Sequence, residues 1–350
     1  MSRFRVLFAI LAALFVVAFI AACGDDDNAT TTPSTASSAT AAASGSASAT
    51  TAASATAAAS DVTVKLGFSA WPGWFPWQVA KEKGIFDQVG LDVDLVWFEG
   101  YLDSINAFAA GQLDANTQTL NDTIPSVAAG SDQRIVLVND NSTGNDQIIV
   151  SSGINTIQDL RGKTIGVDGT ESTAAFVDRV LSSAGLGSGD VHVVDVKFNQ
   201  VPALLGGKVD AVAGVFQNIE GVLFAMRGLH PVVFPYDRYG VPAYDELVVV
   251  ANADRLRDDA DYRTTVREFV AGLAAGTDWA KAHPGAAVAV MRRHSADDYR
   301  NVLEQSVPAT LRLLGTGPPP EAAWARFGTW MFESGLLDEK PDAAALIARP

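Results

Sequence analysis

A nine-residue pattern that occurs twice constrains the fold more than any other feature of this chain. The copies span residues 107–115 and 203–211, about 96 residues apart. In each copy a helical pattern reaches a glycine that can adopt the left-handed conformation typical of helix ends, and an Asp-Ala pair then begins a short buried strand. The repeat predicts two lobes of similar build. The alternative is that this helix-to-strand joint is simply common in α/β proteins.

Strand and helix patterns alternate along the chain. Period-two apolar patterns at residues 62–66 and 91–97 are each followed by a helical pattern, and these end at Gly84 and Gly111. The alternation continues to Ala251, which predicts an α/β fold with mainly parallel sheets flanked by helices. Beyond Ala251 the pattern is helical, at residues 262–282, 285–294 and 321–334.

The first 23 residues have the layout of an export signal. Two arginines precede an apolar stretch at residues 6–20, and small residues follow. Cys23 is the only cysteine of the chain, and Ile20-Ala21-Ala22-Cys23 resembles the bacterial lipobox. That resemblance implies cleavage before Cys23 and lipidation of its thiol, which would anchor the protein to the outer (periplasmic) face of the cell membrane. The alternative is an uncleaved signal anchor, because residues 6–22 approach the length of a spanning helix.

Residues 24–60 separate this signal from the rest of the chain. From Asp25 onward they consist mostly of Ala, Ser and Thr and contain no large apolar side chain, so they cannot form a core. We expect a disordered, solvated tether with a root-mean-square reach of about 35 Å. The remaining residues suffice for two lobes. We predict that residues 61–150 and 245–350 form lobe 1 and that residues 151–244 form lobe 2.

Charge and motifs argue against several functional classes. The formal net charge of −15 disfavours nucleic acid or anionic lipid as a partner. The four histidines have no metal-ligand spacing, and no Gly-x-Ser-x-Gly elbow occurs. We therefore predict no metal, no cofactor and no catalytic residue.

The loops that follow the predicted strands contain carboxylates but neither lysine nor arginine. If these loops converge, they form a cleft that favours a cation or a neutral molecule rich in N–H donors. A compact anion would depend on backbone amides at helix starts. The acidic residues of these loops are Glu99, Asp103, Asp122, Asp140, Asp146, Asp168, Glu171 and Glu220.

Acidic residues near helix starts are often caps, which is the role we expect for Asp103, Asp168 and Glu171. We expect the ligand to contact Asp122, Asp146 and Glu220. The offset of the repeat places Asp122 opposite Asn218, one in each lobe.

Three tryptophans fall within seven residues, at Trp71, Trp74 and Trp77, and at least Trp71 and Trp74 are expected on a loop that leads into the first helix. Aromatic faces stack on flat ligands and cations. We expect Trp71 and Trp74 to do so, with Tyr101 and Phe216 as weaker members of the same cage. Trp77 is expected to pack the helix against the sheet.

Several segments resemble a known family. Ala80-Lys81-Glu82-Lys83-Gly84-Ile85-Phe86, Gly90-Leu91-Asp92-Val93 and the segment 159–167 are similar to periplasmic solute-binding proteins of the nitrate, sulfonate, taurine and thiamine-precursor group. These proteins serve ABC importers. The resemblance implies a two-lobe periplasmic binding protein fold (type II) with the ligand cleft between the lobes, and permease subunits as partners. We expect a monomer.

Two segments of the chain point to different ligands within this group. Phe216, Asn218 and Glu220 fit an aromatic-x-Asn-x-Glu pattern of the branch that binds hydroxymethylpyrimidine-type thiamine precursors, which implies an aminopyrimidine ligand. Residues 71–77 and 97–104 look more like the sulfonate, taurine and nitrate relatives, so an anion is the alternative. A secreted enzyme of the same fold is a third hypothesis. It is not expected, because the related pyrimidine synthase uses a cysteine cluster and Cys23 is assigned to lipidation.

We therefore predict a lipid-anchored receptor that closes on a small ligand about hinge strands near residues 147–153 and 241–250. Trp71 and Trp74 would stack on the ring, while Asp122 and Glu220 would accept its N–H groups. The full set of expected ligand-binding residues is Trp71, Trp74, Tyr101, Thr119, Asn121, Asp122, Asp146, Thr170, Phe216, Asn218, Glu220 and Tyr244.

Overall fold

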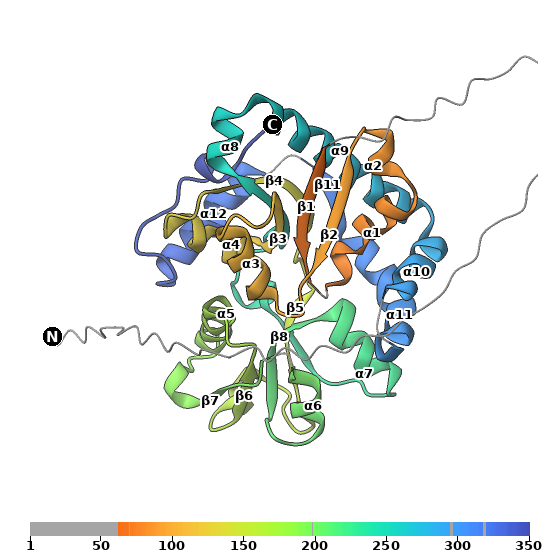
Figure 1. Cartoon of the computed structure of the whole chain (residues 1–350). Helices are drawn as coiled ribbons and strands as arrows, with labels where there is room; N and C mark the ends of the chain where they lie inside the picture. Colours follow the sequence, from red (N-terminus) through yellow and green to blue (C-terminus); the bar gives the residue numbers. More distant parts are fainter. Residues whose placement is uncertain (1–61, 70, 198, 295–296, 318–319) are drawn as a thin grey trace, which may run out of the picture. The chain divides into compact units, whose positions relative to one another are not determined.

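The computed structural model describes residues 62–350 except 70, 198, 295–296 and 318–319 (Figure 1). The predictions of an export signal, a lipidated Cys23 and a tether lie outside the described residues. Sheet A contains β1 (Thr63–Phe68), β2 (Asp92–Trp97), β3 (Ala115–Thr119), β4 (Gln133–Asp140), β10 (Leu247–Asn252) and β11 (Leu314–Gly317), in the order β11-β4-β10-β3-β1-β2. Sheet B contains β5 (Asp146–Val150), β6 (Thr164–Val167), β7 (His192–Asp195), β8 (Ala211–Phe216) and β9 (Val233–Pro235), in the order β7-β6-β8-β5-β9.

Both sheets are mixed, whereas the sequence predicted mainly parallel ones. In sheet A, β1 is parallel to β2 and β3, and β10 is antiparallel to β3 and β4. In sheet B, β6 is parallel to β7 and β8, and β5 is antiparallel to β8 and β9. The first residue of β10, Leu247, pairs with the last of β3, Thr119. A strand that enters from the other sheet begins where the parallel strands end, so it runs in the opposite direction.

The predicted lobe boundary at residue 150 needs a correction. Strand β5 forms its ladders with β8 and β9, so residues 146–150 belong with sheet B. The chain passes between the sheets at residues 141–145 and 236–246. The expected hinge at residues 147–153 therefore overlaps a strand that is fixed within a sheet.

The buried strand β10 contributes to two cores. Leu247, Val249 and Ala251 pack in one cluster, together with residues of α1 (Phe75–Glu82) and α9 (Ala260–Ala282). Val248 and Val250 pack in the other, with residues of α3 (Tyr101–Ala109) and α4 (Leu120–Ala128). Successive side chains of a strand point to opposite faces. Sheet A is thus covered on both faces, which explains why β10 is apolar from Leu247 to Ala251.

The repeated pattern has the same structure in both sheets. Gly111 and Gly207 adopt left-handed conformations, with φ of +72° and +66°, and strands β3 and β8 begin at the predicted alanines. The Asp114 carboxylate accepts a backbone N–H of β1 at 3.0 Å, and the Asp210 carboxylate accepts the corresponding N–H of β6 at 2.9 Å. Each copy therefore fastens a strand to its parallel neighbour in the same way.

The three helices predicted after Ala251 are present as α9, α10 (Pro284–Arg293) and α12 (Glu321–Glu333). Helix α11 (Asp297–Leu313) was not predicted. The remaining helices are α2 (Ile85–Gln88), α5 (Glu171–Ser182), α6 (Gln200–Leu205), α7 (Val222–Met226) and α8 (Ala253–Asp258). Short turns are η1 (Pro72–Trp74), η2 (Ile157–Leu160), η3 (Ser188–Asp190), η4 (Gln217–Gly221), η5 (Tyr236–Tyr239) and η6 (Ala344–Leu346).

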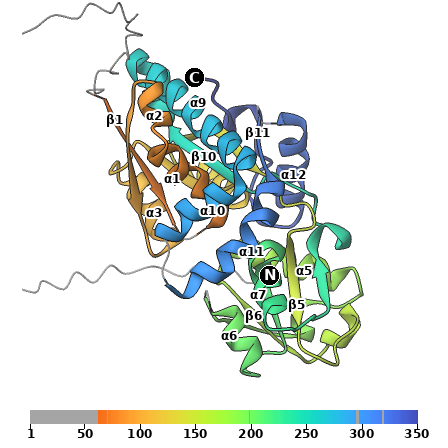
Figure 2. The same ribbon diagram turned by 90° about the vertical axis from the view of Figure 1, so that its right-hand side faces the viewer.

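Helix α11 links the two sheets and their helices. It packs against α10 and η1, which belong with sheet A, and also against η4 and α7, which follow the last strand residues of β8 (Figure 2). The C-terminal part of the chain therefore contacts both halves. Among the described helices, none combines the length and apolar character needed to cross a membrane.

Candidate ligand-binding site

Side chains from the two sheets meet at the ends of β3 and β8. The Asn121 amide nitrogen donates to the Ser172 hydroxyl at 2.9 Å, and this hydroxyl lies 3.2 Å from Asp122 Oδ1, to which it donates. Asn121 and Asp122 follow β3, whereas Ser172 begins α5 on sheet B. The rings of Trp71 and Phe216 also meet edge to face across the junction, with centroids 4.1 Å apart. We call this region the junction.

The tryptophan loop contributes differently from what was expected. Trp74 is 2% exposed, and its ring is stacked with Trp77 at 6.4 Å and with Tyr101 at 6.2 Å between centroids. Its ring therefore packs within the protein, which contradicts the expectation that it stacks on a ligand. The indole Nε1 of Trp74 is buried and has no hydrogen-bond partner among the described residues. Trp71 is half-buried, and its stacking on a ligand stays a prediction.

A chain of hydrogen bonds holds Asp122 in place. The Tyr101 hydroxyl accepts from the Thr119 backbone N–H at 2.9 Å and contacts the Thr119 hydroxyl at 3.2 Å. The Thr119 hydroxyl in turn donates to Asp122 Oδ2 at 2.8 Å. Burial nevertheless raises the pKa of Asp122. Both oxygens of this carboxyl group are occupied by protein donors, so Asp122 joins the two sides of the junction.

Asp146 and Tyr244 form a second pair. The Tyr244 hydroxyl donates to Asp146 Oδ2 at 2.8 Å, and the Tyr244 ring stacks on Phe327 at 4.5 Å with an interplanar angle of 4°. Tyr244 therefore positions Asp146. The other oxygen, Asp146 Oδ1, is buried without a described partner. Burial raises the pKa of Asp146 to about 7.

Two further carboxyl groups were not selected from the sequence. Asp140 accepts the Leu247 N–H at 2.7 Å, and burial raises its pKa to about 8. Glu246 is 2% exposed, its Oε2 has no described partner, and burial together with repulsion from Asp146 and Asp140 raises its pKa well above the usual range. Asp140 was among the acidic loop residues, while Glu246 falls in the segment expected to be a hinge. The signal that distinguishes them, burial without a counter-ion, is visible only in three dimensions.

The aromatic-x-Asn-x-Glu segment begins at Phe216, the last residue of β8, and continues on η4, a single π-helical turn. Such turns are frequent at functional sites. The Asn218 backbone N–H donates to Asn145 Oδ1 at 3.1 Å, and its side-chain amide donates to the Thr310 hydroxyl at 2.9 Å. Glu220 accepts the Phe216 N–H at 2.9 Å, and burial raises the pKa of Glu220 to about 7. This segment therefore faces the junction, where Phe216 meets Trp71.

Thr170 is the N-cap of α5. Its hydroxyl oxygen accepts from the Thr173 N–H at 3.3 Å and donates to Asp168 Oδ1 at 2.9 Å. Asp168 also accepts from the Thr173 hydroxyl at 3.0 Å, which agrees with the role at a helix start that was expected for it. Thr170 is thus engaged in local structure and lies beside Ser172 at 3.3 Å between hydroxyl oxygens.

The junction contains more unpaired acceptors than donors. The buried side-chain oxygens without a described partner are Asn121 Oδ1, Asn218 Oδ1, Asp146 Oδ1 and Glu246 Oε2. The buried N–H groups of the junction without a described partner are those of Trp74 Nε1 and Asn145 Nδ2. Each buried unpaired polar group costs about 1–3 kcal/mol. Such groups are expected where a ligand completes the hydrogen bonding.

The carboxyl groups of the junction have no basic partner among the described residues. Within the described residues, Asp122, Asp140, Asp146, Glu220 and Glu246 form no salt bridge. No described group of three or more His, Cys, Asp and Glu side chains is arranged to hold a metal ion. The arrangement can therefore accept hydrogen bonds from a ligand that carries N–H groups.

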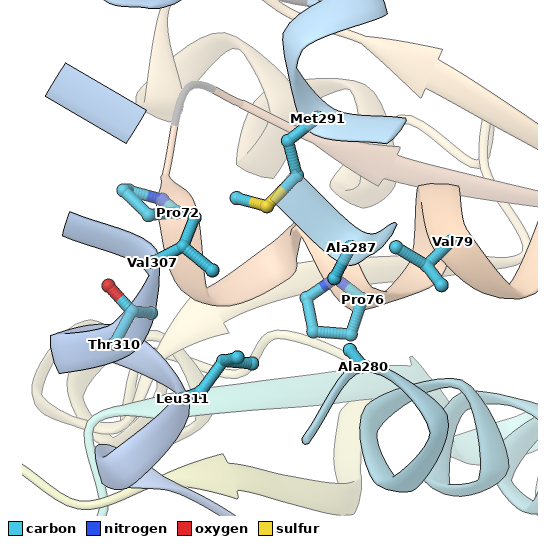
Figure 3. A pocket seen from close by; sticks show the side chains of 9 residues that line it. All are labelled: Pro72, Pro76, Val79, Ala280, Ala287, Met291, Val307, Thr310 and Leu311. Atoms are coloured by element: carbon cyan, nitrogen blue, oxygen red, sulfur yellow. The ribbon is translucent and has the colours of Figure 1, made fainter. Parts of the chain in front are cut away.

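The apolar pocket in Figure 3 is a different feature. It lies between η1, α1, α9, α10 and α11 and has a volume of about 10 Å³, roughly the space of one water molecule. Its lining residues are Pro72, Pro76, Val79, Ala280, Ala287, Met291, Val307, Thr310 and Leu311. We regard it as a packing defect next to the junction, because it cannot hold a larger molecule.

Known proteins share this sequence and architecture. A Haemophilus influenzae protein named "Putative thiamine biosynthesis protein" is 29% identical over 272 residues, which are 77% of this chain and 84% of that protein. The formylaminopyrimidine-binding protein of Halalkalibacterium halodurans is 28% identical over 218 residues, 61% of this chain and 64% of that protein.

The structural comparison confirms the predicted fold. The solved periplasmic aliphatic sulphonate binding protein SsuA from Escherichia coli matches with a TM-score of 0.65 at 17% identity, covering 83% of this chain and 93% of that one. The two-lobe α/β fold of periplasmic binding proteins is therefore present. The family model described as "NMT1/THI5 like" matches residues 71–287. Because this match spans more than half of the sequence, the chain belongs to the NMT1/THI5-like family.

Proposed function

We propose that this protein is the extracytoplasmic substrate-binding protein of an ABC importer and that it captures an aminopyrimidine of the thiamine-precursor type. One observation carries the proposal: the junction holds four buried acceptors without a partner, two of them on carboxyl groups, and no described basic side chain pairs with its carboxyl groups. Such a set of oxygens favours a ligand that donates hydrogen bonds.

An aminopyrimidine offers the hydrogen bonds that these buried groups lack. Its exocyclic amino group offers two N–H donors to acceptors such as Asn218 Oδ1 and Glu246 Oε2. Its ring nitrogens are acceptors, which suit the unpaired indole N–H of Trp74. The half-buried Trp71 ring offers a face for a flat heterocycle. The Halalkalibacterium relative, named for binding formylaminopyrimidine, supports the same ligand class.

The acidic junction disfavours the anionic alternative. A sulfonate, taurine or nitrate would approach carboxyl groups whose raised pKa values already reflect burial and mutual repulsion. At the start of α5, the Thr173 N–H already donates to the Thr170 hydroxyl. The likeness to sulfonate-binding structures concerns the fold alone.

The remaining parts of the proposal concern location and partners. We propose that residues 1–23 direct export, that lipid on Cys23 anchors the protein outside the cell membrane, and that a tether at residues 24–60 lets the folded part reach permease subunits. We further propose a monomer that binds its ligand without converting it. The related proteins named as binding proteins support this role.

Thermal unfolding of the full chain in the presence of candidate ligands tests the proposed function. A ligand at 100 times its Kd adds about 2.7 kcal/mol of stability. We expect stabilisation by hydroxymethyl-aminopyrimidine and none by taurine, ethanesulfonate or nitrate. Asp146→Asn should reduce this stabilisation, whereas Asp210→Asn, at the distant repeat joint, should not. Stabilisation by the sulfonates instead, or chemical change of the recovered pyrimidine, would contradict the proposal.

A further inference from the structure

Helix α11 brings one polar side chain to the edge of the junction. Thr310 is 2% exposed and lies near the C-terminal end of this helix. Its methyl-bearing side chain lines the small apolar pocket beside Val307 and Leu311 (Figure 3). Its hydroxyl reaches Asn218 of η4 at 2.9 Å. A helix that sequence analysis left out thus contacts the segment assigned to ligand binding.

The direction of these hydrogen bonds is fixed by chemistry. The Thr310 hydroxyl lies 2.9 Å from the Ser306 backbone carbonyl, which can only accept, so the hydroxyl proton is donated to Ser306. The Thr310 oxygen can then only accept from its other neighbour. The Asn218 side chain must therefore present its NH₂ group to Thr310, and its carbonyl oxygen is turned the opposite way.

The consequence is an acceptor with a fixed orientation. Asn218 Oδ1 is buried and has no partner among the described residues. The Asn218 backbone is held by its own bond to Asn145, so rotation of the side-chain amide is the remaining freedom at this position. We propose that Thr310 is a specificity-setting positioning residue: it locks the Asn218 amide so that the site accepts an N–H group and rejects a carbonyl at that point. The proposal rests on the proposed function for its ligand class.

A second asparagine shows the same arrangement. The Ser172 hydroxyl donates to Asp122 Oδ1, so its oxygen accepts from the Asn121 NH₂ group. Asn121 Oδ1 is likewise buried and unpaired. Two separate hydrogen-bond chains therefore fix the side-chain amides of Asn218 and Asn121. In both, the NH₂ group is bound within the protein and the carbonyl oxygen is left as a free acceptor.

Paired ligands test the proposal with the full chain. 4-Aminopyrimidine and pyrimidin-4-one present an amino group and a carbonyl oxygen at the same ring position. The wild type should prefer the amino compound. Thr310→Val replaces the hydroxyl by a methyl group of similar size and should reduce the affinity ratio about tenfold, whereas Thr310→Ser should keep it. Equal weakening of both ligands by Thr310→Val would show a merely structural role and overturn the proposal.

A measurement without ligand separates this inference from the proposed function. Hydrogen exchange of the Asn218 side-chain NH₂, followed by NMR, should be slow in the wild type and in Thr310→Ser, and fast in Thr310→Val. Thr310→Ala serves as the second variant if the valine substitution prevents folding. Unchanged exchange on loss of the hydroxyl would overturn the role of Thr310. If the wild type binds neither pyrimidine, the proposed function fails, while the exchange measurement still decides whether Thr310 orients the Asn218 amide.

Discussion

Acidic side chains at the repeat joints and at the junction of the sheets lie in opposite environments. At the joints, Asp114 and Asp210 are half-buried and accept backbone N–H groups of neighbouring strands. Each also has a basic partner, Arg255 at 2.8 Å and Lys163 at 3.8 Å. Their negative charge is matched within the protein, and their role is to join strands.

At the junction the charges are not matched. Asp140, Asp146 and Glu246 are each at most 4% exposed, and the described part of the chain gives them no basic partner. A buried ionised carboxylate without compensation is costly, so these groups hold their protons to higher pH. Even adjacent residues differ: Asp245 accepts from Trp324 at 2.8 Å and Asn141 at 3.3 Å, whereas Glu246 has an unpaired oxygen. An acidic residue is therefore a candidate for function when it is buried without a basic partner or with an oxygen that accepts no hydrogen bond.

The largest expected effect that tests this contrast is a pH dependence of stability. The pKa values of Asp140 and Asp146 are raised to about 8 and about 7 from an ordinary 3.8. The folded protein therefore retains protons that the unfolded chain releases above about pH 4. Its free energy of unfolding should fall as pH rises from 5 to 7, by about 1.4 kcal/mol per pH unit for each such group. Urea unfolding of the unliganded full chain measures this slope.

A substitution control makes the pH experiment specific. Asp146→Asn should reduce the slope by about 1.4 kcal/mol per pH unit, because the amide has no proton to release, while the contribution of Asp140 stays. Asp210→Asn should leave it unchanged, since that residue lies at a repeat joint. A stability that is flat or increases with pH in the wild type would show that the junction carboxyl groups are not protonated as described.

The next effect concerns ligand affinity. Glu246→Gln keeps the shape of the side chain but replaces one carboxyl oxygen by an NH₂ group, so we expect the affinity for an aminopyrimidine to fall by about 1–3 kcal/mol, the cost of leaving a buried polar group unpaired. Titration calorimetry at pH 7.5 measures it. The same variant should be more stable without ligand at this pH, because its amide is neutral without taking up a proton, whereas burial and repulsion from Asp146 and Asp140 make Glu246 hold one. A loss of both affinity and stability would instead indicate a structural role for Glu246.

The smallest effect is expected at the repeat joint. Asp210→Ala removes the acceptor for the Thr164 N–H, and we expect a loss of about 1–2 kcal/mol in the free energy of unfolding. The exposed contact with Lys163 adds little. Ligand affinity should not change. Reduced affinity at unchanged stability would contradict the purely structural role assigned to the acidic residues at the repeat joints.

The sequence predicted the parts of the fold that depend on local patterns. The glycine and the Asp-Ala pair of each repeat copy correctly predicted both helix-to-strand joints, and the hydrophobic periodicity correctly predicted α9, α10 and α12. The antiparallel direction of β5 and β10 was missed, because it depends on how the chain crosses between the sheets. Helix α11 was missed because its sequence is largely polar and contains Pro308.

The candidate site was predicted in part, and the reasons for the misses are physical. The segment of Phe216, Asn218 and Glu220 meets the tryptophan loop where Phe216 contacts Trp71, as the chemistry of the residues suggested. Trp74 was expected to stack on a ligand because local sequence does not show that Trp77 and Tyr101 stack with its ring. Glu246 was overlooked because its burial depends on strands distant in the chain. Whether these residues contact the ligand remains a prediction.

A crystal structure of the protein with a 4-aminopyrimidine decides whether the unpaired oxygens of the junction bind the ligand. We expect the amino nitrogen to lie within hydrogen-bonding distance, about 2.7–3.2 Å, of at least one of Asn121 Oδ1, Asp146 Oδ1, Asn218 Oδ1 and Glu246 Oε2. A pyrimidine bound away from all four oxygens, with these atoms still unpaired, would contradict this expectation.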